Sequence, residues 1–200
     1  MHHIVTLLSA ALLFALPTIA QDKITVDDLS HHPFSTDFPS GGSLNLDIRS
    51  AEIHILGADD EKLSVRIGGA EGSEATDIQA RFRRSGNSAD LDVSGGPHND
   101  IVITVLVPSH SNLTIRIPAG DVEVKGIAGN KDIRLRAGDL KIDVGDPADY
   151  AYVEASVSSG DIEARPFGEE HGGLFRSFHK SGSGKYTLVA RLWAGDLTLR

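Results

Sequence analysis

Hydrophobic and polar residues alternate along most of this chain, and a short Gly-Asp motif interrupts the alternation at four places in its second half. Leu113, Ile115 and Ile117 precede the first motif at every second position, and Val122 and Val124 follow it in the same way. Period-two alternation on both sides of a Gly-Asp corner predicts a strand, a turn and a second strand. Glycine tolerates the positive φ of a tight corner, and the following aspartate can accept a backbone N–H. The expected structural corners are Gly120, Gly138, Gly160 and Gly195.

The spacing of these corners predicts a stack of repeats. The intervals are 18, 22 and 35 residues, and an insertion over residues 166–184 widens the last one. A single strand–corner–strand unit cannot bury its own apolar residues, so such units stack on one another. The sequence therefore predicts an all-β fold, a β-solenoid or β-helix-like stack of strand–Gly-Asp–strand repeats. An antiparallel β-sandwich with hairpins at the corners is the alternative.

The same pattern divides the chain into segments. Residues 34–200 are expected to form one β-repeat domain, with irregular strands over residues 34–110 and Gly-Asp repeats over residues 111–200. Residues 49–55 match a degenerate first copy of the repeat, and the polar residues 21–33 are expected to be a flexible lead-in. If the units stack in chain order, residues 193–200 belong to an end unit. Their removal should then leave the earlier units folded.

The first 20 residues differ in character from the rest. Residues 4–16 are mostly apolar, and Pro17 and small residues follow them up to Ala20. This order predicts a secretory signal peptide over residues 1–20, cleaved before Gln21. A membrane span needs about 20 apolar residues, and this run is shorter. We therefore expect an exported chain, periplasmic or extracellular at the cell surface, with no membrane span after cleavage.

Composition narrows the possible chemistry. The chain has no cysteine, which excludes disulfides, thiol-linked lipid anchors and cysteine-based metal or redox sites. Its net charge of −9 at pH 7 argues against nucleic acid and against anionic membranes as partners. The sequence also lacks a serine-nucleophile elbow, a P-loop and a glycine-rich dinucleotide motif. These features favour an acidic β-rich scaffold over the enzyme classes that such motifs mark.

The aspartates of the four corners would line up along one edge of a stack. They are Asp121, Asp139, Asp161 and Asp196. Neighbouring carboxylates repel one another unless they are solvated, hydrogen-bonded or bridged by cations, so a calcium edge is conceivable. Calcium-binding Gly-Asp rolls repeat every nine residues, whereas these motifs lie 18 or more residues apart. The spacing favours turn chemistry, and we expect no cofactor, with calcium as the alternative.

Two further groups of residues could carry chemistry. Asp143, Asp146 and Asp149 could supply paired carboxylates for acid–base work on a sugar, although three aspartates beside Pro147 are typical of a solvated turn. The histidines that could form a metal cluster are His31, His32, His171 and His179. Their spacing matches no compact ligand pair on a helix or hairpin. We therefore expect turn aspartates and scattered loop histidines.

Two sets of side chains concern the surface. Arg134 and Arg136 share one strand face, out of phase with the apolar positions, and are predicted to be an outward face that needs no ligand. The insertion contains Phe167, Phe175 and Phe178 among glycines and serines. These aromatic residues either cap an end of the stack or form an exposed contact patch, and capping is favoured because open β edges need cover.

The order of these features resembles a known family. A signal segment, irregular strands and a Val107-Pro108 step precede tandem strand–Gly-Asp–strand units over residues 113–124, 133–144, 153–162 and 188–199. This order is similar to the bacterial putative-adhesin family of β-strand-repeat, Gly-Asp-repeat exported envelope proteins, a domain of unknown function. The family has a fuller Gly-x-Gly-Asp form, whereas alanine or serine precedes each glycine here. The resemblance implies an exported β-repeat scaffold.

We therefore expect an exported, non-enzymatic β-repeat protein of the cell envelope that acts as an adhesin or surface interaction scaffold. Its partner would be another envelope protein, a surface polysaccharide or a second copy of itself. Two alternatives come from other functional classes. One is a small carbohydrate-active enzyme built on a β-helix, and the other is a calcium-stabilised structural module.

Overall fold

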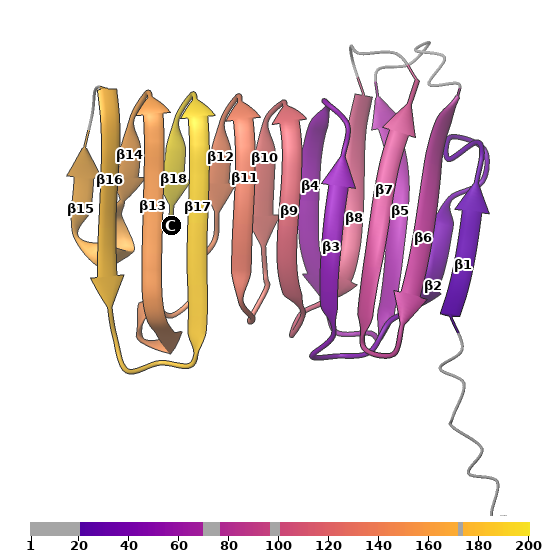
Figure 1. Cartoon of the computed structure of the whole chain (residues 1–200), viewed down its shortest axis with the longest axis horizontal. Coiled ribbons are helices and arrows are strands. Elements are labelled where there is room, and N and C mark those ends of the chain that lie inside the picture. The colour runs from indigo at the N-terminus through magenta and orange to yellow at the C-terminus, as the bar shows by residue number, and fades with distance from the viewer. Residues whose placement is uncertain (1–20, 70–76, 97–100, 172–173) are drawn as a thin grey trace, which may run out of the picture.

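The structure is a computed structural model that describes residues 21–69, 77–96, 101–171 and 174–200. Two nine-stranded sheets lie face to face in two layers, and neither closes on itself (Figure 1). Sheet A contains, in spatial order, β1 (Gln21–Val26), β6 (Ile78–Ser85), β7 (Ser88–Gly95), β3 (Ser43–Ile48), β9 (Asn112–Ala119), β11 (Lys131–Ala137), β17 (Tyr186–Ala194), β13 (Tyr150–Ser159) and β16 (Leu174–Ser181). Sheet B contains β15 (Glu169–His171), β14 (Ile162–Ala164), β18 (Leu197–Leu199), β12 (Leu140–Ile142), β10 (Val122–Lys125), β4 (Glu52–Ala58), β8 (Ile101–Pro108), β5 (Lys62–Gly69) and β2 (Phe34–Asp37).

The all-β prediction is confirmed, and the sheets are mixed rather than antiparallel. Six neighbouring strands in the centre of each sheet run parallel, from β7 to β13 in sheet A and from β8 to β14 in sheet B. Antiparallel strands flank this centre at both ends. Two short 3-10 segments, η1 (Pro147–Asp149) and η2 (Arg165–Phe167), lie in connections. The arrangement is sandwich-like.

Each Gly-Asp motif lies where the chain passes from sheet A to sheet B, so the strands on its two sides belong to different sheets. The hairpin corners of the antiparallel sandwich alternative are therefore wrong. Stacking in chain order is also wrong, because the fourth unit (β17–β18) lies between the second (β11–β12) and the third (β13–β14). The connection through η1 carries the chain past one strand position, and the insertion returns it to fill the gap.

The core lies between the two sheets and consists of the alternate residues of every central strand. One row of sheet A runs in register through Leu46, Ile115, Ile133, Ala190 and Ala155, all essentially buried. Parallel strands in register place equivalent side chains beside one another, so these residues form continuous apolar rows. The alternation seen in the sequence thus supplies the inward face of each sheet, and the polar positions between form the outer faces.

The segment expected to be a flexible lead-in, residues 21–33, is part of the fold. β1 pairs antiparallel with β6 along its whole length. Leu29 is buried in the core, and its N–H donates to the carbonyl of Ile78 at 2.9 Å. Ile24 and Val26 alternate with polar residues and pack against the same core, which explains why this polar segment forms an edge strand.

Residues 1–20, for which the sequence predicts a signal peptide, lie outside the described residues. In the part of the chain that the structure does describe, no helix is long and apolar enough to cross a membrane.

The insertion provides edge strands for one end of both sheets. β15 pairs with β14 at the edge of sheet B, and β16 pairs with β13 at the edge of sheet A. Phe167 and Phe178 are buried against this end, with ring centroids 6.4 Å apart. Phe175 is 80% exposed. Two of the three aromatic residues therefore cap the core, and the third lies on the surface.

Candidate functional site

The four corner glycines stack in one column between the sheets. Their φ angles lie between 116° and 134°, a region that residues with a side chain rarely adopt. A Cβ atom at Gly138 would lie 2.2 Å from the carbonyl oxygen of Gly120, and one at Gly195 would lie 2.0 Å from that of Gly138. Both the backbone angle and the close approach of neighbouring corners therefore require glycine here.

The corner aspartates form a hydrogen-bonded ladder in the spatial order Asp121, Asp139, Asp196, Asp161. The Oδ1 atom of each of the first three accepts the backbone N–H of the next aspartate, at 3.2, 3.2 and 3.0 Å. Hydrogen bonds of this kind stabilise the charged form of each accepting carboxylate. Among the residues that the structure describes, no group of three or more histidine or acidic side chains is arranged to hold a metal ion.

The three aspartates of the connection between β12 and β13 act locally. Asp143 accepts the N–H of Gly145 at 3.0 Å, and Asp146 accepts that of Ala148 at 2.9 Å and caps η1. Together with Asp149 and Tyr150 they line a small pocket of about 230 Å³. Bonds to N–H groups two residues ahead are typical of Asx turns.

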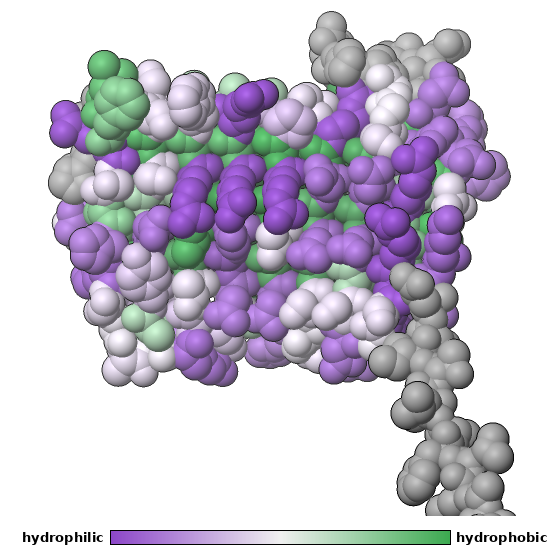
Figure 2. Space-filling model, in the orientation of Figure 1, coloured by the Kyte–Doolittle hydropathy of each residue, from purple (hydrophilic) through white to green (hydrophobic). Residues whose placement is uncertain are grey.

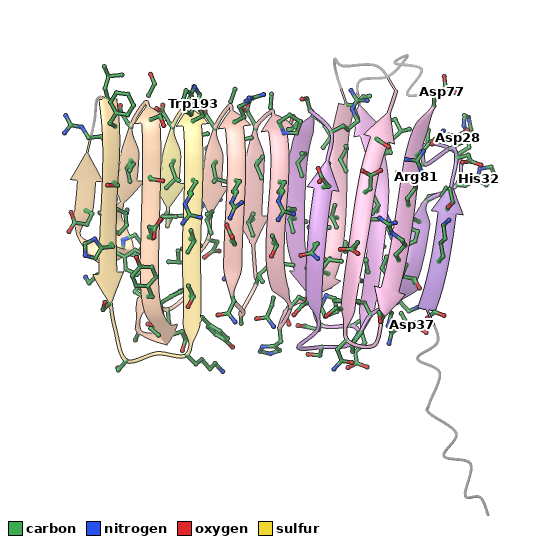
Figure 3. The ribbon with its side chains drawn as sticks, in the orientation of Figure 1. Asp28, His32, Asp37, Asp77, Arg81 and Trp193 are labelled. Carbon is green, nitrogen blue, oxygen red and sulfur yellow. The ribbon has the colours of Figure 1, made fainter. Side chains whose placement is uncertain are left out.

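The structure separates His179 from His31 and His32. His31 bonds Asp28 at 2.7 Å beside β1, and Figure 3 shows His32 at the same end of the molecule. His179 lies on β16, the strand at the opposite edge of sheet A. The side chain of His171 lies outside the described part of the chain. This separation agrees with the histidine spacing in the sequence, which matched no metal-ligand pattern.

Lys131, at the start of β11, is a buried cation that the sequence did not mark as unusual. Its side chain is 1% exposed, and its Nζ donates to the Tyr150 hydroxyl at 2.9 Å and to the Gly129 carbonyl at 3.2 Å. Burial lowers the pKa of Lys131 to about 8, and the nearby Asp143 carboxylate opposes this shift only in part. Its bond to Tyr150 links the start of β11 to the start of β13.

A larger feature lies on the outer face of sheet A. It is an open groove of about 760 Å³, which we call the arginine groove. One side consists of Arg116, Arg134 and Arg191, and the other consists of Pro118, Arg136 and Trp193. Figure 2 shows hydrophilic side chains in a row across β9, β11 and β17, with an apolar band beside them. Backbone of the three strands forms the floor, where the side chains of Ile117, Leu135 and Leu192 point into the core.

The three arginines of the first side are in direct cross-strand register. Arg134 pairs with Arg116 on one side and with Arg191 on the other. Like charges that face each other across strands destabilise a sheet, so this row opposes folding unless something compensates it. Arg134 bonds Asp132 at 3.1 Å, and Arg191 bonds Glu154 at 2.9 Å. Among the described residues, Arg116 and Arg136 make no ion pair or side-chain hydrogen bond.

The outer face of sheet B is organised differently. Glu123 on β10 receives Lys125 at 2.8 Å, His54 at 3.3 Å and the guanidinium of Arg200. Lys125 and His54 lower the pKa of the Glu123 carboxyl. Positive and negative groups alternate across these strands, and the charges neutralise one another. Three arginines in direct cross-strand register are thus a property of sheet A.

Sequence reasoning missed the arginine groove. Arg134 and Arg136 were placed correctly on an outward face but were predicted to need no ligand. Arg116 and Arg191 lie far from them along the chain and become neighbours only through the parallel register of β9, β11 and β17. The available signal was the equal position of arginine in three repeats, four residues before each of the corner glycines Gly120, Gly138 and Gly195. Trp193, 67% exposed at the end of β17 (Figure 3), carried no such signal.

Comparison with known proteins gives a similarity of fold. No family model and none of the curated proteins match the chain. The structure is similar to that of a putative cell adhesion protein from Clostridium sporogenes ATCC 15579, with a TM-score of 0.51 and 11% identity over 90% of this chain and 98% of that one. A putative adhesin from Bacteroides fragilis NCTC 9343 is similar with a TM-score of 0.37 and 12% identity, over 91% of this chain and 99% of that one. The first of these solved structures shares the fold of this chain.

Proposed function

We propose that this chain is an exported, non-enzymatic surface interaction protein of the adhesin type, and that the arginine groove is its contact surface. The observation that carries this proposal is the row of Arg116, Arg134 and Arg191 on adjacent strands of a protein with a net charge of −9. A like-charged row that opposes folding is a common mark of a binding surface, because a partner of opposite charge compensates it.

Membership of the putative-adhesin family and a solenoid-like origin of the repeats belong to the same proposal. The Gly-Asp corners that stack in one column and the shared fold with a protein described as a putative cell adhesion protein support both. In this view each unit is one rung, and the fourth rung was placed between the second and third by the long insertion. Export through residues 1–20 and a location in the periplasm or at the cell surface complete the proposal.

Three kinds of partner are considered, and the net charge of the chain weighs against one of them. Another envelope protein, a surface polysaccharide and a second copy of this chain all fit an exported scaffold. A second copy would bring a further net charge of −9, which opposes self-association over long distances. The two alternative functions would use other parts of the structure. An enzyme would use the acidic pocket of about 230 Å³, and a calcium-stabilised module would use the corner aspartates.

The test is attachment of the mature chain to intact bacterial envelopes. Residues 21–200 carrying a fluorescent label are sedimented with envelope preparations, alongside the double variant Arg116→Ser/Arg134→Ser. The matched control is Lys125→Ser/Lys141→Ser, which removes the same charge from the outer face of sheet B. We expect the envelopes to retain about tenfold less of the first variant than of the unmodified chain, as for residues central to an interface. The control variant should be retained as well as the unmodified chain. Equal retention of all three proteins would contradict the proposal.

A further inference from the structure

We propose that the arginine groove takes an acidic polysaccharide, a sugar polymer that carries carboxylates, lying across β9, β11 and β17. This inference rests on the proposed function, since it names the ligand class of the same surface. Four observations lead to it: the spacing of the arginines, their free donors, the exposed indole beside them and the open shape of the groove.

The spacing of the arginines suits a polymer with regularly repeated charges. Arg116, Arg134 and Arg191 lie on neighbouring strands, which are separated by about 4.8 Å. A chain that crosses the strands therefore meets one guanidinium at each step, and a step of this size is comparable to the length of one sugar ring. A guanidinium binds a carboxylate through two parallel N–H bonds, which favours carboxylates over neutral groups.

The guanidinium groups still have donors to offer. Each carries five N–H donors. Arg134 and Arg191 use some of them on Asp132 and Glu154, and these bonds hold the two heads in place beside the groove. Arg116 and Arg136 have no such partner within the described ranges, so their donors face solvent. The groove thus combines two oriented cations with two uncommitted ones.

The other side of the groove offers groups that suit a sugar ring. Trp193 lies level with Arg136 and with Ser158 on the neighbouring strands, since their flanking residues are paired. Its indole is 67% exposed on a protein whose large aromatic side chains are otherwise mostly buried. The apolar face of a sugar ring packs on such a surface, and the hydroxyls of Ser156 and Ser158 lie at the same end of the groove to bond sugar hydroxyls.

The shape and the surrounding charges argue against other polyanions. An acidic peptide strand would gain affinity by pairing its backbone with a sheet edge, but the groove lies on a sheet face whose backbone groups are already paired. Nucleic acid carries one charge per about 1.7 Å of duplex, far denser than one per sugar. Asp47, Asp132 and Glu154 beside the groove would repel so dense a polymer.

The experiment measures binding of residues 21–200 to four polymers by titration calorimetry. The probes are polygalacturonate as the acidic polysaccharide, dextran as a neutral one, poly-L-glutamate and a DNA oligonucleotide. We expect polygalacturonate to bind at least about tenfold more tightly than each of the others. Trp193→Ser and Arg116→Ser/Arg134→Ser should each weaken that binding about tenfold or more, whereas Lys125→Ser/Lys141→Ser should leave it unchanged. Melting temperatures close to that of the unmodified chain show that the variants are folded.

Three results would overturn the inference. Equal affinity for poly-L-glutamate or DNA would mean attraction of charge alone. An unchanged affinity of the Trp193→Ser variant for polygalacturonate would show that no sugar ring packs on Trp193. No binding of polygalacturonate, combined with loss of envelope attachment in Arg116→Ser/Arg134→Ser, would show that the ligand class is wrong while the proposed contact surface is right. If envelope attachment is also insensitive to that variant, the proposed function fails with it.

Discussion

In the centre of the molecule six parallel strands of each sheet are joined by tight corners, whereas both ends are closed by antiparallel strands and aromatic side chains. The core row through the centre, from Leu46 to Ala155, contains only leucine, isoleucine and alanine. At one end Phe34 and Phe82 pack with centroids 5.4 Å apart, and at the other Tyr150 packs against Phe167 at 6.1 Å. The centre therefore depends on close approach of backbones, and the ends depend on large side chains that cover an open core.

The largest expected effect comes from removing the chain's last strand. β18 lies inside sheet B, between β12 and β14, and Leu197 and Leu199 are completely buried. Deleting residues 196–200 would split the sheet and remove about 3–6 kcal/mol of burial from a total stability of about 5–15 kcal/mol. We expect no cooperative thermal transition, measured by circular dichroism.

A deletion at an end of the molecule is the control for this prediction. Starting the chain at Asp27 removes β1, which pairs with β6 alone among the described strands. This variant should melt cooperatively at a lower temperature. A cooperative melt near the original temperature for the chain that lacks residues 196–200 would show that the centre does not depend on β18.

A corner substitution tests how closely the central backbones approach. Gly138→Val combines a positive φ with a clash against the Gly120 carbonyl, so we expect a loss of about 3–5 kcal/mol in the free energy of unfolding. Gly145 has a φ of 67° but nothing within 4 Å of its added Cβ. Gly145→Val should therefore cost only the backbone strain, about 1–3 kcal/mol. Similar losses in urea unfolding of the two variants would argue against the stacked column.

The buried Lys131, which links the start of β11 to the start of β13, predicts how the stability of the protein depends on pH. Its pKa is lowered from 10.5 to about 8, so between these values the unfolded chain binds the proton and the folded chain does not. The stability of the protein should therefore rise from pH 8 towards pH 10. Lys131→Met removes the buried charge and should add about 1–3 kcal/mol at pH 7. That gain should shrink as the pH rises, and a gain independent of pH would exclude the lysine as its cause.

The smallest expected effect concerns the surface of one end. Phe175 has a φ of 52°, where a bulky side chain is strained, and it is 80% exposed. Phe175→Asn should stabilise the fold by about 0.5–1 kcal/mol, because asparagine tolerates this conformation and little packing is lost. A clear loss of stability in chemical denaturation would mean that Phe175 belongs to the cap after all.

The prediction from sequence succeeded where a property is local. The alternation through residues 113–117 and 122–124 placed β9 and β10, and their inward residues are the buried ones. The order of the units could not be predicted in the same way. Any parallel strand with apolar residues at alternate positions can pair with any other, so β17 and β13 compete for the same edge of β11. Only the length and path of the connections decide between them.

The sequence by itself determined the all-β class, the strands and the positions at which the chain turns, because side-chain alternation and the freedom of glycine act within a few residues. The tertiary structure alone decided which strands are neighbours, and with that which polar residues meet. Arg116, Arg134 and Arg191 are separated by up to 75 residues, yet they form one row because three strands pair in parallel register. A surface of this kind exists only once the sheet has formed.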